Sequence, residues 1–379
     1  MNKITLNYQI CKNCVNDTSD PGITFDAEGN CDQCLNFKKN ILPIWNYGKN
    51  QISKISKTIE KINCITSSNN CLIGISGGLD SSYLAYVAKK IFGLRPLLFH
   101  CDAGWNSERA VTNIEKITNG LGLDLATEVV NWDEIKKLQL AFFKSSVASQ
   151  DIPQDLVFFS SLYKFAKKNN FKYILTGGNY SMESIRGPID YGYYATDLTF
   201  VKDIFKKFGE GSFPKLPMID ILNYQIYLRF FKGISMIKLL NYVPFVKKDA
   251  INTLSVKFGW KPFSLKHHES IFTRFYDAYY TKLRYNFDRR RVYYSAEILS
   301  NQMARNDALD FLTIDTTKEK KTIEDYFYIA KKLDLNEIEF DNLIKLKPNK
   351  INSFKNKKFI INGFVKLSNI LNIENRKFR

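Results

Sequence analysis

The sequence predicts an α/β protein built around a parallel sheet with helices on both faces. Residues 71–75 form a short, branched apolar run typical of a buried strand, and this run ends at two adjacent glycines before a helical pattern starts near Leu79. Strand-like and helical runs then alternate up to about residue 200, which is the order that builds parallel sheets. Two cysteine pairs precede the alternating region, and long aromatic-rich helical segments follow it.

Residues 1–40 are predicted to form a small zinc-binding module. It contains two C-x-x-C pairs, Cys11 with Cys14 and Cys31 with Cys34. Four thiolates at this spacing suit tetrahedral zinc in a segment too short to build its own core. Two disulfides are the alternative, and a reducing cytoplasm disfavours them. We expect the metal to be structural, because four cysteine ligands leave no position for a water molecule.

The α/β domain is expected to cover residues 70–200, after a connecting helix over residues 41–69. The strands expected after the first are 96–101, 127–130 and 171–175, and the helices run from Leu79 to about residue 92 and over 107–120, 132–146 and 154–169. Residues 201–379 are predicted to be mainly helical, with a short strand-like run at 358–361.

The turn after the first strand has the composition of a polyphosphate site. Gly77 and Gly78 allow the backbone to approach a ligand closely, and the following helix points its free N–H groups and positive dipole end at that ligand. Three serines add hydroxyl donors, and Asp80 is placed to hold a magnesium ion against phosphate oxygens. No lysine follows the glycines, so a Walker A loop is excluded. The alternative is a helix-capping turn with no ligand.

The whole string Ser-Gly-Gly-Leu-Asp-Ser-Ser at 76–82 resembles the PP-loop of ATP pyrophosphatases. That resemblance implies binding of the β and γ phosphates of ATP and transfer of AMP to a carbonyl oxygen. A second glycine turn at 176–179 follows the strand at 171–175 and is expected beside the first, as in a doubly wound sheet. The expected ATP-binding residues are Ser76, Gly77, Gly78, Asp80, Ser81, Ser82, Gly177 and Asn179.

Two further segments are candidates for binding a second substrate. Asp102 ends the predicted strand 96–101, where parallel sheets build their sites, so it is a candidate magnesium or substrate ligand; an ordinary turn aspartate is the alternative. In the helical region, donors and acceptors gather near one helix start and suit an anionic or polyol ligand, although a solvated helix face is the alternative. These substrate candidates are His267, Glu269, Ser270, Arg274 and, in the following arginine run, Arg290.

Charge and hydropathy limit the class of protein. The formal net charge of +17 suits an anionic partner, yet Lys, Asn and Ile are frequent throughout and no dense basic tract stands out beyond residues 289–291. The N-terminus lacks a signal-peptide apolar region, and no apolar run is long enough to span a membrane. We therefore expect a cytoplasmic protein with no membrane partner.

With these segments in place, the sequence resembles the N-acetyl sugar amidotransferases, which are PP-loop enzymes of bacterial surface-glycan synthesis. The resemblance covers almost the whole chain. It rests on residues 11–34, the string 76–82, the segments 102–108, 152–155, 176–184 and 267–276, and Gln302 with Met303. It implies conversion of an N-acetyl group on a nucleotide-linked sugar into an acetamidino group, as in some O-antigen mannuronates and in legionaminic or pseudaminic acid derivatives. It also implies a partner similar to the glutaminase and cyclase subunits of imidazole glycerol phosphate synthase.

The expected reaction needs no covalent protein nucleophile. The amide oxygen attacks the α-phosphate of ATP, ammonia adds at the activated carbon, and AMP leaves; Asp80 and Asp102 are the expected catalytic, metal-orienting residues. A glutaminase needs a cysteine nucleophile, normally with a histidine base. Apart from the predicted zinc ligands the chain has Cys64, Cys71 and Cys101, none in such a setting. We therefore expect a separate glutaminase to supply the ammonia.

Two rival functions remain open on the sequence alone. A PP-loop enzyme that modifies RNA, of the tRNA thiolase or lysidine synthase type, would use the same adenylation and the positive charge. A thiolase is expected to use further reactive cysteines, and the best-placed four are assigned to zinc, so we expect no nucleic-acid partner. The second rival is a zinc-stabilised scaffold whose nucleotide site is vestigial.

Overall fold

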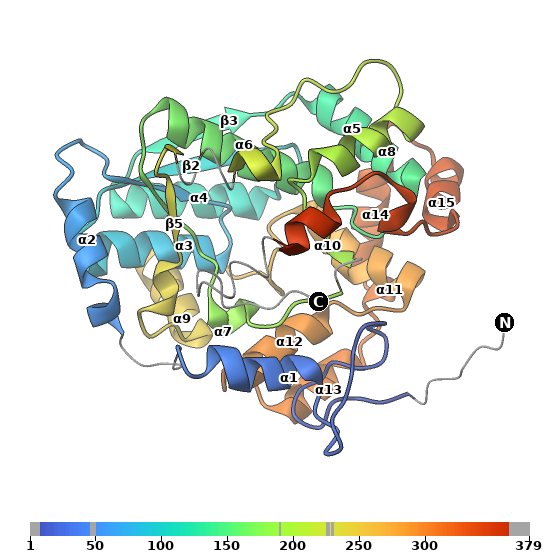
Figure 1. Ribbon diagram of the computed structural model, residues 1–379, viewed down its shortest axis with the longest axis horizontal. Helices are drawn as coiled ribbons and strands as arrows, with labels where there is room; N and C mark the ends of the chain where they lie inside the picture. Colours follow the sequence, from blue (N-terminus) through green and yellow to red (C-terminus); the bar gives the residue numbers. More distant parts are fainter. Residues whose placement is uncertain (1–7, 46–50, 189–190, 225–227, 229–230, 364–379) are drawn as a thin grey trace.

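The computed structural model describes residues 8–45, 51–188, 191–224, 228 and 231–363, and its centre is one sheet of five parallel strands (Figure 1). The strand order is β3-β2-β1-β4-β5. The strands are β1 (Cys71–Gly74), β2 (Pro96–Asp102), β3 (Leu125–Val129), β4 (Tyr173–Leu175) and β5 (Ser235–Ile237). The predicted α/β class is therefore confirmed, and the four strands expected between residues 70 and 200 are present.

The register of the sheet places two glycine turns next to each other. Strand β1 pairs with β2 on one side and with β4 on the other, and Ile73 lies opposite both Leu98 and Leu175. Because all three strands run in the same direction, the segments that follow β1, β2 and β4 emerge at one edge of the sheet. The expectation that residues 176–179 lie beside the turn after β1 is confirmed.

Alternate residues of β1 face two different cores, as expected for a strand covered on both sides. Ile73 packs in a core with helices from one face, whereas Leu72 packs in a second core with residues of α6 from the other face. The first group of helices is α2 (Ser56–Asn63), α3 (Leu79–Tyr86), α4 (Glu108–Leu121) and α9 (Lys247–Phe258). Helix α6 (Ile152–Lys168) covers the opposite face.

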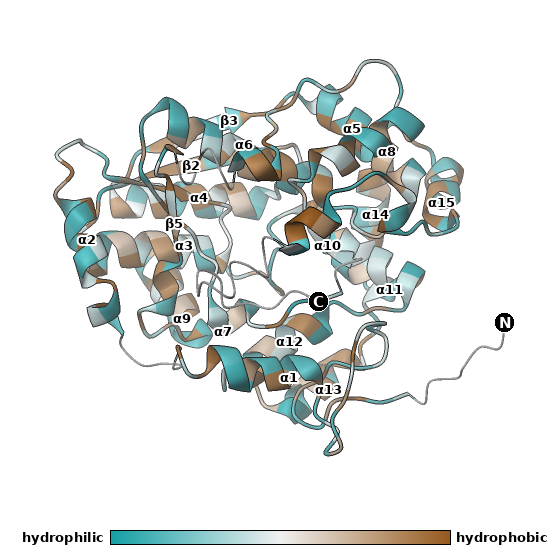
Figure 2. Cartoon of the chain, in the orientation of Figure 1, coloured by the Kyte–Doolittle hydropathy of each residue, from teal (hydrophilic) through white to brown (hydrophobic). Residues whose placement is uncertain are grey.

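The helices at the surface are amphipathic, and Figure 2 shows hydrophilic and hydrophobic residues together on α2, α4 and α15. In α2, Ile59 and Ile62 are buried on the side that faces the core, while Glu60 is exposed. Within the described part of the chain, no helix combines the length and the apolar character that crossing a bilayer requires.

Two segments differ from the secondary structure expected from the sequence. Strand β5 lies beyond residue 200, so the sheet uses a segment that the prediction assigns to the helical region. This strand has three residues, which are too few for a periodic pattern to be detected, and it lies at the edge of the sheet. Residues 358–363 are helical, so the strand-like run at 358–361 was wrong. Of the expected connecting helix over 41–69, residues 46–50 lie outside the described residues.

The C-terminal region is mainly helical, as predicted, and has its own aromatic core. It contains α10 (Ile271–Phe275), α11 (Thr281–Tyr285), α12 (Arg290–Leu299), α13 (Arg305–Leu312), α14 (Lys320–Lys332) and α15 (Glu337–Lys345). Phe272 and Phe275 of α10 pack with Phe340 of α15 and with Phe143 of α5 (Trp132–Ser145). Helix α5 thus joins the C-terminal core to the α/β domain, and α8 (Leu198–Phe208) packs beside α5.

Candidate functional site

The turn between β1 and α3 is held in place by its backbone. Gly77 has φ of +78°, a left-handed conformation, and its carbonyl oxygen accepts hydrogen bonds from Asn113 Nδ2 at 3.1 Å and Trp260 Nε1 at 2.9 Å. A Cβ atom on Gly77 would lie 2.3 Å from the carbonyl oxygen of Ala110 in α4. Both the conformation and the close approach therefore require glycine at this position.

The two glycine turns are in contact across the sheet edge. A Cβ atom on Gly177 would lie 2.9 Å from the carbonyl carbon of Asp80 and 3.0 Å from the backbone nitrogen of Ser81. The Ser81 hydroxyl in turn accepts from the backbone N–H of Ser76 at 3.2 Å. Serine hydroxyls and glycine backbone are thus concentrated at the N-terminus of α3, which is the arrangement that binds phosphate groups.

Lys266 places a positive charge beside this turn. Its Nζ is ion-paired with Asp80 Oδ2 and with Glu183 Oε1, the latter at 3.1 Å, and its side chain is only 7% exposed. Burial alone lowers the pKa of Lys266, but the two carboxylates outweigh burial and raise it, so the lysine stays charged. Burial raises the pKa of Asp80 while Lys266 opposes that rise. The sequence has no lysine directly after the two glycines. The turn at residues 75–78, called the phosphate turn below, instead has Lys266 beside it, from a distant segment of the chain.

Two cavities meet at the phosphate turn. One, of about 250 Å³, lies over the turn and the start of α3, and the other, of about 680 Å³, extends across the carboxyl ends of β1 and β2. The residues that line both cavities are Gly74, Ser76, Thr176, His267 and Glu269. A third cavity of about 440 Å³, lined in part by Arg289, shares His267 with the other two. A ligand in the turn therefore lies next to a second, larger space.

Glu269 projects its carboxylate into the phosphate turn. The Ser76 hydroxyl donates to Glu269 Oε1 at 2.7 Å. The backbone of this segment is fixed against the loop after β2, because Ser107 N–H donates to the Glu269 carbonyl at 3.0 Å and Ile271 N–H donates to the Trp105 carbonyl at 2.8 Å. Burial raises the pKa of Glu269, and the hydrogen bond from Ser76 opposes that rise.

Most of the predicted ATP-binding residues lie together, and three have structural surroundings instead. Those that line the smaller cavity are Ser76, Gly78, Asp80, Ser81 and Gly177. Gly77 faces α4 and Trp260, which follows α9, as described above. Ser82 is fully buried, and Asn179 caps α7 (Tyr180–Glu183), where its Oδ1 accepts from Met182 N–H at 2.9 Å and its Nδ2 donates to the Gly177 carbonyl at 2.8 Å. Asn179 thus shapes the second glycine turn without lining the cavity.

Asp102 is not brought to the site of Asp80. Its Oδ1 accepts from the backbone N–H of Gly104 at 2.7 Å, and Asp102 lines none of the three cavities. The open alternative, an aspartate that stabilises its own turn, describes this geometry. His100, two residues earlier in β2, points to the large cavity instead.

The predicted substrate residues divide into two groups. His267, Glu269 and Ser270 line the large cavity. Arg274 does not, because its guanidinium pairs with Asp325 through two hydrogen bonds of 2.5 and 2.8 Å and so joins α10 to α14.

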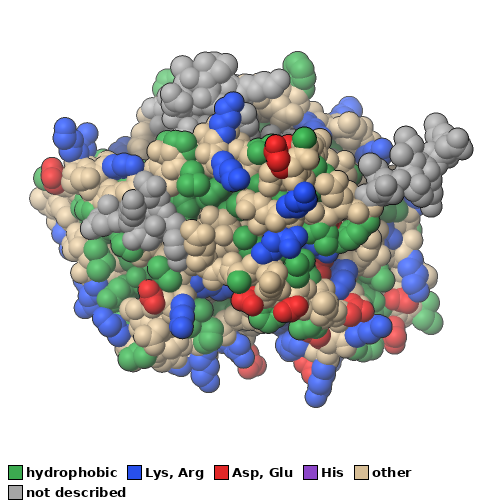
Figure 3. Space-filling model, turned by 90° about the horizontal axis from the view of Figure 1, so that it is seen from below, with side chains coloured by type: hydrophobic (Ala, Val, Ile, Leu, Met, Phe, Trp, Pro, Cys, Tyr) green, Lys and Arg blue, Asp and Glu red, His purple; other side chains and the backbone are tan. Residues whose placement is uncertain are grey.

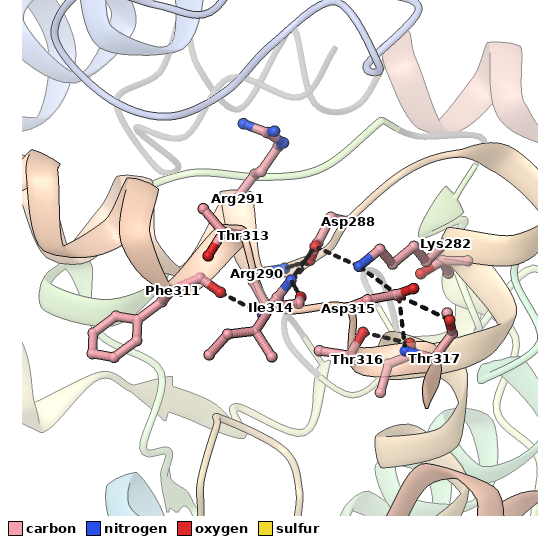
Figure 4. A network of polar contacts seen from close by, with 12 residues as sticks. Lys282, Asp288, Arg290, Arg291, Phe311, Thr313, Ile314, Asp315, Thr316 and Thr317 are labelled. Carbon is pink, nitrogen blue, oxygen red and sulfur yellow. Dashed lines mark hydrogen bonds and ion pairs between the residues drawn. The ribbon is translucent and has the colours of Figure 1, made fainter. Parts of the chain in front are cut away.

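Arg290 is also committed to structure, and its neighbour Arg289 occupies the cavity wall instead. The Arg290 guanidinium pairs with Asp288 at 2.6 Å and donates to the carbonyl oxygens of Phe311 and Ile314, each at 2.8 Å (Figure 4). Arg289 lines the large cavity, and its Nε lies 2.6 Å from Asp277 Oδ1. Successive residues at a helix start point in different directions, so an arginine run in a sequence does not say which member faces a ligand.

The functional candidates that the sequence interpretation missed are Lys266, Glu183, Arg289 and Asp155. Lys266 adjoins the predicted substrate segment and Glu183 follows the second glycine turn, so their positions were a signal in hindsight. Asp155 lies in the first turn of α6 and belongs to the segment 152–155 that carries the family resemblance, although no role was predicted for it.

The four cysteines of the N-terminal module lie together in a buried cluster. All four Sγ atoms lie within 4.8 Å of one another, and three of the pairs are 3.6 to 3.7 Å apart. Four ligands on tetrahedral zinc at Zn–S of about 2.3 Å would lie about 3.8 Å apart, so these residues fit the metal. None of the cysteines forms a disulfide.

The module packs against the C-terminal helices, and Figure 1 shows α1 (Asp32–Asn36) beside α12 and α13. Arg305 of α13 donates to the carbonyl oxygens of Cys14 at 3.0 Å and Cys11 at 2.8 Å. Arg291 of α12 pairs with Asp17 Oδ2 at 3.0 Å. The cysteine cluster therefore fixes a surface on which helices far along the chain are anchored.

Comparisons with known proteins match two parts of the chain. Residues 51–211 match the NAD synthase family, and residues 269–368 match the family described as LPS biosynthesis protein WbpG-like, C-terminal domain. The first match covers both glycine turns and every strand of the sheet except β5. The second match begins at Glu269. The α/β domain and the C-terminal region, which contributes Glu269 to the phosphate turn, thus match two known families.

Individual proteins show more distant similarity. The tRNA-5-methyluridine(54) 2-sulfurtransferase of Pyrococcus horikoshii is 30% identical over 135 residues, which are 35% of this chain and 42% of that protein. The chain therefore spans about two fifths of that relative. A crystal structure described as a predicted subunit of tRNA methyltransferase from Methanocaldococcus jannaschii aligns with a TM-score of 0.29 and 17% identity, covering 49% of this chain and 75% of that one.

The order of parts is therefore a four-cysteine module, an NAD synthase-like PP-loop domain on a five-stranded parallel sheet, and a helical WbpG-like C-terminal region. This combination matches the family that the sequence resembles. The two matches together support an N-acetyl sugar amidotransferase type of PP-loop family.

Proposed function

We propose that the protein is an ATP-dependent, AMP-forming amidotransferase that converts the N-acetyl group of a nucleotide-linked sugar into an acetamidino group. The observation that carries this proposal is the shared wall between the phosphate turn and the large cavity, formed in part by Ser76, Thr176 and Glu269. A nucleotide whose pyrophosphate lies in the turn would present its α-phosphate to a second substrate in that cavity. Such positioning lowers the barrier for a reaction between two bound molecules.

The proposed reaction has two steps. In the first, the amide oxygen of the sugar forms a bond to the α-phosphorus of ATP, and pyrophosphate leaves with the electrons of the broken P–O bond. In the second, ammonia bonds to the activated carbon, AMP leaves with its oxygen, and a proton is lost. The Ser76 and Ser81 hydroxyls and the N-terminus of α3 would stabilise the leaving pyrophosphate, and Lys266 would offset its charge. Magnesium, for which Asp80 is the proposed ligand, would neutralise further phosphate charge.

The large cavity has the mixed lining that suits a sugar nucleotide. Aromatic side chains such as Phe158 and Tyr194 lie in its wall together with the polar groups of Gln154, Asp155 and Arg289. Aromatic faces pack against sugar rings and bases, while a few placed polar groups fix orientation. Arg289 adds a cation, held by Asp277, for a carboxylate or phosphate of the substrate.

Ammonia is proposed to come from a separate glutaminase with a cyclase-like subunit. Outside the zinc cluster the chain has three cysteines, and burial raises the pKa of Cys71 and of Cys101 to about 12. Both are therefore neutral thiols near pH 7, and a thiolate is the form that attacks glutamine. Cys64 is exposed and lines none of the three cavities.

RNA modification is the second candidate, favoured by the similarity to the sulfurtransferase of Pyrococcus horikoshii. The net charge of +17 agrees with a nucleic-acid partner. Figure 3 shows the face that is seen from below relative to Figure 1. On this face Lys and Arg side chains are scattered among acidic ones, without the continuous basic stripe of a nucleic-acid site. Cys101 lines the large cavity, but its raised pKa makes it a poor sulfur carrier.

Pyrophosphate release from ATP tests the proposal. The purified chain is mixed with MgATP and ammonium salt, and with either candidate nucleotide sugars or bulk tRNA. We expect release with an N-acetylated nucleotide sugar, loss of release in Asp80→Asn, and unchanged release in Asp133→Asn, a control at an exposed aspartate of α5. Release with tRNA alone would favour RNA modification, and no release with either would favour the scaffold.

A further inference from the structure

A carboxylate occupies the phosphate turn. Glu269 Oε1 accepts the Ser76 hydroxyl at 2.7 Å. A Cβ atom on Gly78 would lie 2.7 Å from Glu269 Oε1 and 3.0 Å from Oε2, so the carboxylate fills the space that the absent side chain of Gly78 leaves open. These are the hydroxyl and the glycine surface that a phosphate group in this turn would contact.

The backbone around Glu269 fixes this placement. Residues Asn106 and Ser270 form an antiparallel bridge, and the backbone hydrogen bonds of Ser107 and Ile271 flank it on both sides. His267, two residues before Glu269, adopts φ of +63°, a left-handed conformation that is uncommon for residues other than glycine. The chain therefore holds the carboxylate at the turn through a segment where the WbpG-like match begins, at Glu269.

The charges around the turn make the carboxylate and a pyrophosphate mutually exclusive. Three acidic groups, Asp80, Glu183 and Glu269, line the smaller cavity, and Lys266 pairs with the first two of them. A pyrophosphate that entered beside Glu269 would place like charges in contact in a mostly buried site, where they repel strongly. Glu269 also lines the large cavity, so its side chain has a second space beside it.

We propose that Glu269 is an internal competitor for the phosphate turn. Its carboxylate leaves Ser76 and Gly78 when the pyrophosphate part of ATP binds, and it turns into the large cavity. This inference rests on the proposed ATP site, and it goes beyond that site by coupling it to the neighbouring cavity. Nucleotide binding then delivers a carboxylate to the place where the second substrate lies, and the second substrate in turn affects nucleotide affinity by the same factor.

Glu269→Gln and Glu269→Asp together separate competition from a purely structural role. Glutamine keeps the shape of the side chain and its capacity to accept the Ser76 hydrogen bond, but it removes the negative charge. If Glu269 only braces the turn, loss of its negative charge in Glu269→Gln strengthens anion binding by electrostatics alone, and Glu269→Asp, which keeps the charge, does not bind anions more tightly. If Glu269 competes with phosphate, both replacements strengthen anion binding.

The experiment is calorimetric titration of the purified full chain with inorganic pyrophosphate, without divalent cations, and with MgATP. We expect Glu269→Gln to bind pyrophosphate at least tenfold more tightly than the wild type. Glu269→Asp, whose shorter side chain does not reach Ser76 in the same way, should also bind more tightly, and it serves if the glutamine variant fails to fold. Glu60→Gln, at an exposed position of α2, is the matched control and should bind like the wild type.

The outcomes distinguish this inference from the proposed function. One outcome is that the wild type binds MgATP but neither Glu269 variant binds pyrophosphate more tightly than the wild type. This outcome overturns the competition and leaves the ATP site standing. Absence of binding of both ligands to the wild type and to both variants overturns the ATP site and the competition together. Tighter pyrophosphate binding in Glu269→Asp as well as in Glu269→Gln, but not in Glu60→Gln, supports the inference, and a gain in Glu269→Gln alone overturns it.

Discussion

We predict that the N-terminal module holds one zinc ion, and that removal of this metal unfolds the module and releases the helices that it anchors. The spacing of the sulfur atoms, 3.6 to 3.7 Å in three pairs, is close to the edge of about 3.8 Å expected for a zinc tetrahedron. Structural zinc sites of this type contribute about 10 kcal/mol or more to folding of the segment that binds them. Because the cysteines are the core of the module, little else holds it together once a ligand is lost.

Cys34→Ser removes one ligand and is the perturbation of choice, with Cys64→Ser as control because Cys64 is exposed and outside the cluster. We expect one zinc per chain in the wild type and the control by elemental analysis, and well under one in Cys34→Ser. Limited proteolysis should then cut within residues 8–45 of the variant while the α/β domain survives. The melting temperature of the whole chain should fall by several degrees, because the contacts of Arg291 and Arg305 with the module are lost. A wild-type chain without zinc, equally resistant to protease after chelation, would refute this reasoning.

Two further predictions concern the sheet and its cavities. Gly77→Ala should lower the free energy of unfolding by about 2 kcal/mol or more and abolish ATP binding, because the residue is left-handed and its Cβ would overlap the Ala110 carbonyl; Gly122→Ala, left-handed but open, is the control, and equal melting curves and nucleotide affinities for the two variants would contradict the account. Iodoacetamide at pH 7.5 should modify Cys64 quickly in the native, zinc-loaded chain, whereas Cys71 and Cys101, with a pKa of about 12, should react only after unfolding. Mass spectrometry counts the adducts, and rapid labelling of Cys101 would restore the case for a sulfur-carrying cysteine.

Strands β1 to β4 were predicted because each of them has a recognisable apolar pattern within a few residues. The branched apolar runs that became β1 and β2 are bounded by glycine or polar residues, and the complete string of serines and glycines after β1 resembles a PP-loop. Strand β5 was missed for the opposite reason, since three residues at a sheet edge carry no period. Its existence depends on β4, which it pairs with, rather than on its own sequence.

The site was predicted less completely, because its remaining residues come from segments whose direction a sequence does not specify. Arg290 and Arg289 are adjacent, yet one pairs with Asp288 inside a helix junction and the other reaches the cavity. The choice between them is set by the helical phase of α12, which packing determines. Asp102 was predicted to orient the metal because it lies at a strand end, but its carboxylate accepts a hydrogen bond from its own loop.

The phosphate turn itself depends on contacts that lie far apart in the sequence. Its central carbonyl, that of Gly77, is held by Asn113 and Trp260, and its open surface is filled by Glu269. A helix-capping turn without a ligand would need none of these groups, whereas a turn that must present a fixed row of donors to an anion needs its backbone braced from behind. The bracing comes from α4 and the segment after α9, and the resident carboxylate comes from the C-terminal region. The seven-residue string therefore identifies the turn, and contacts from distant parts of the chain determine its shape.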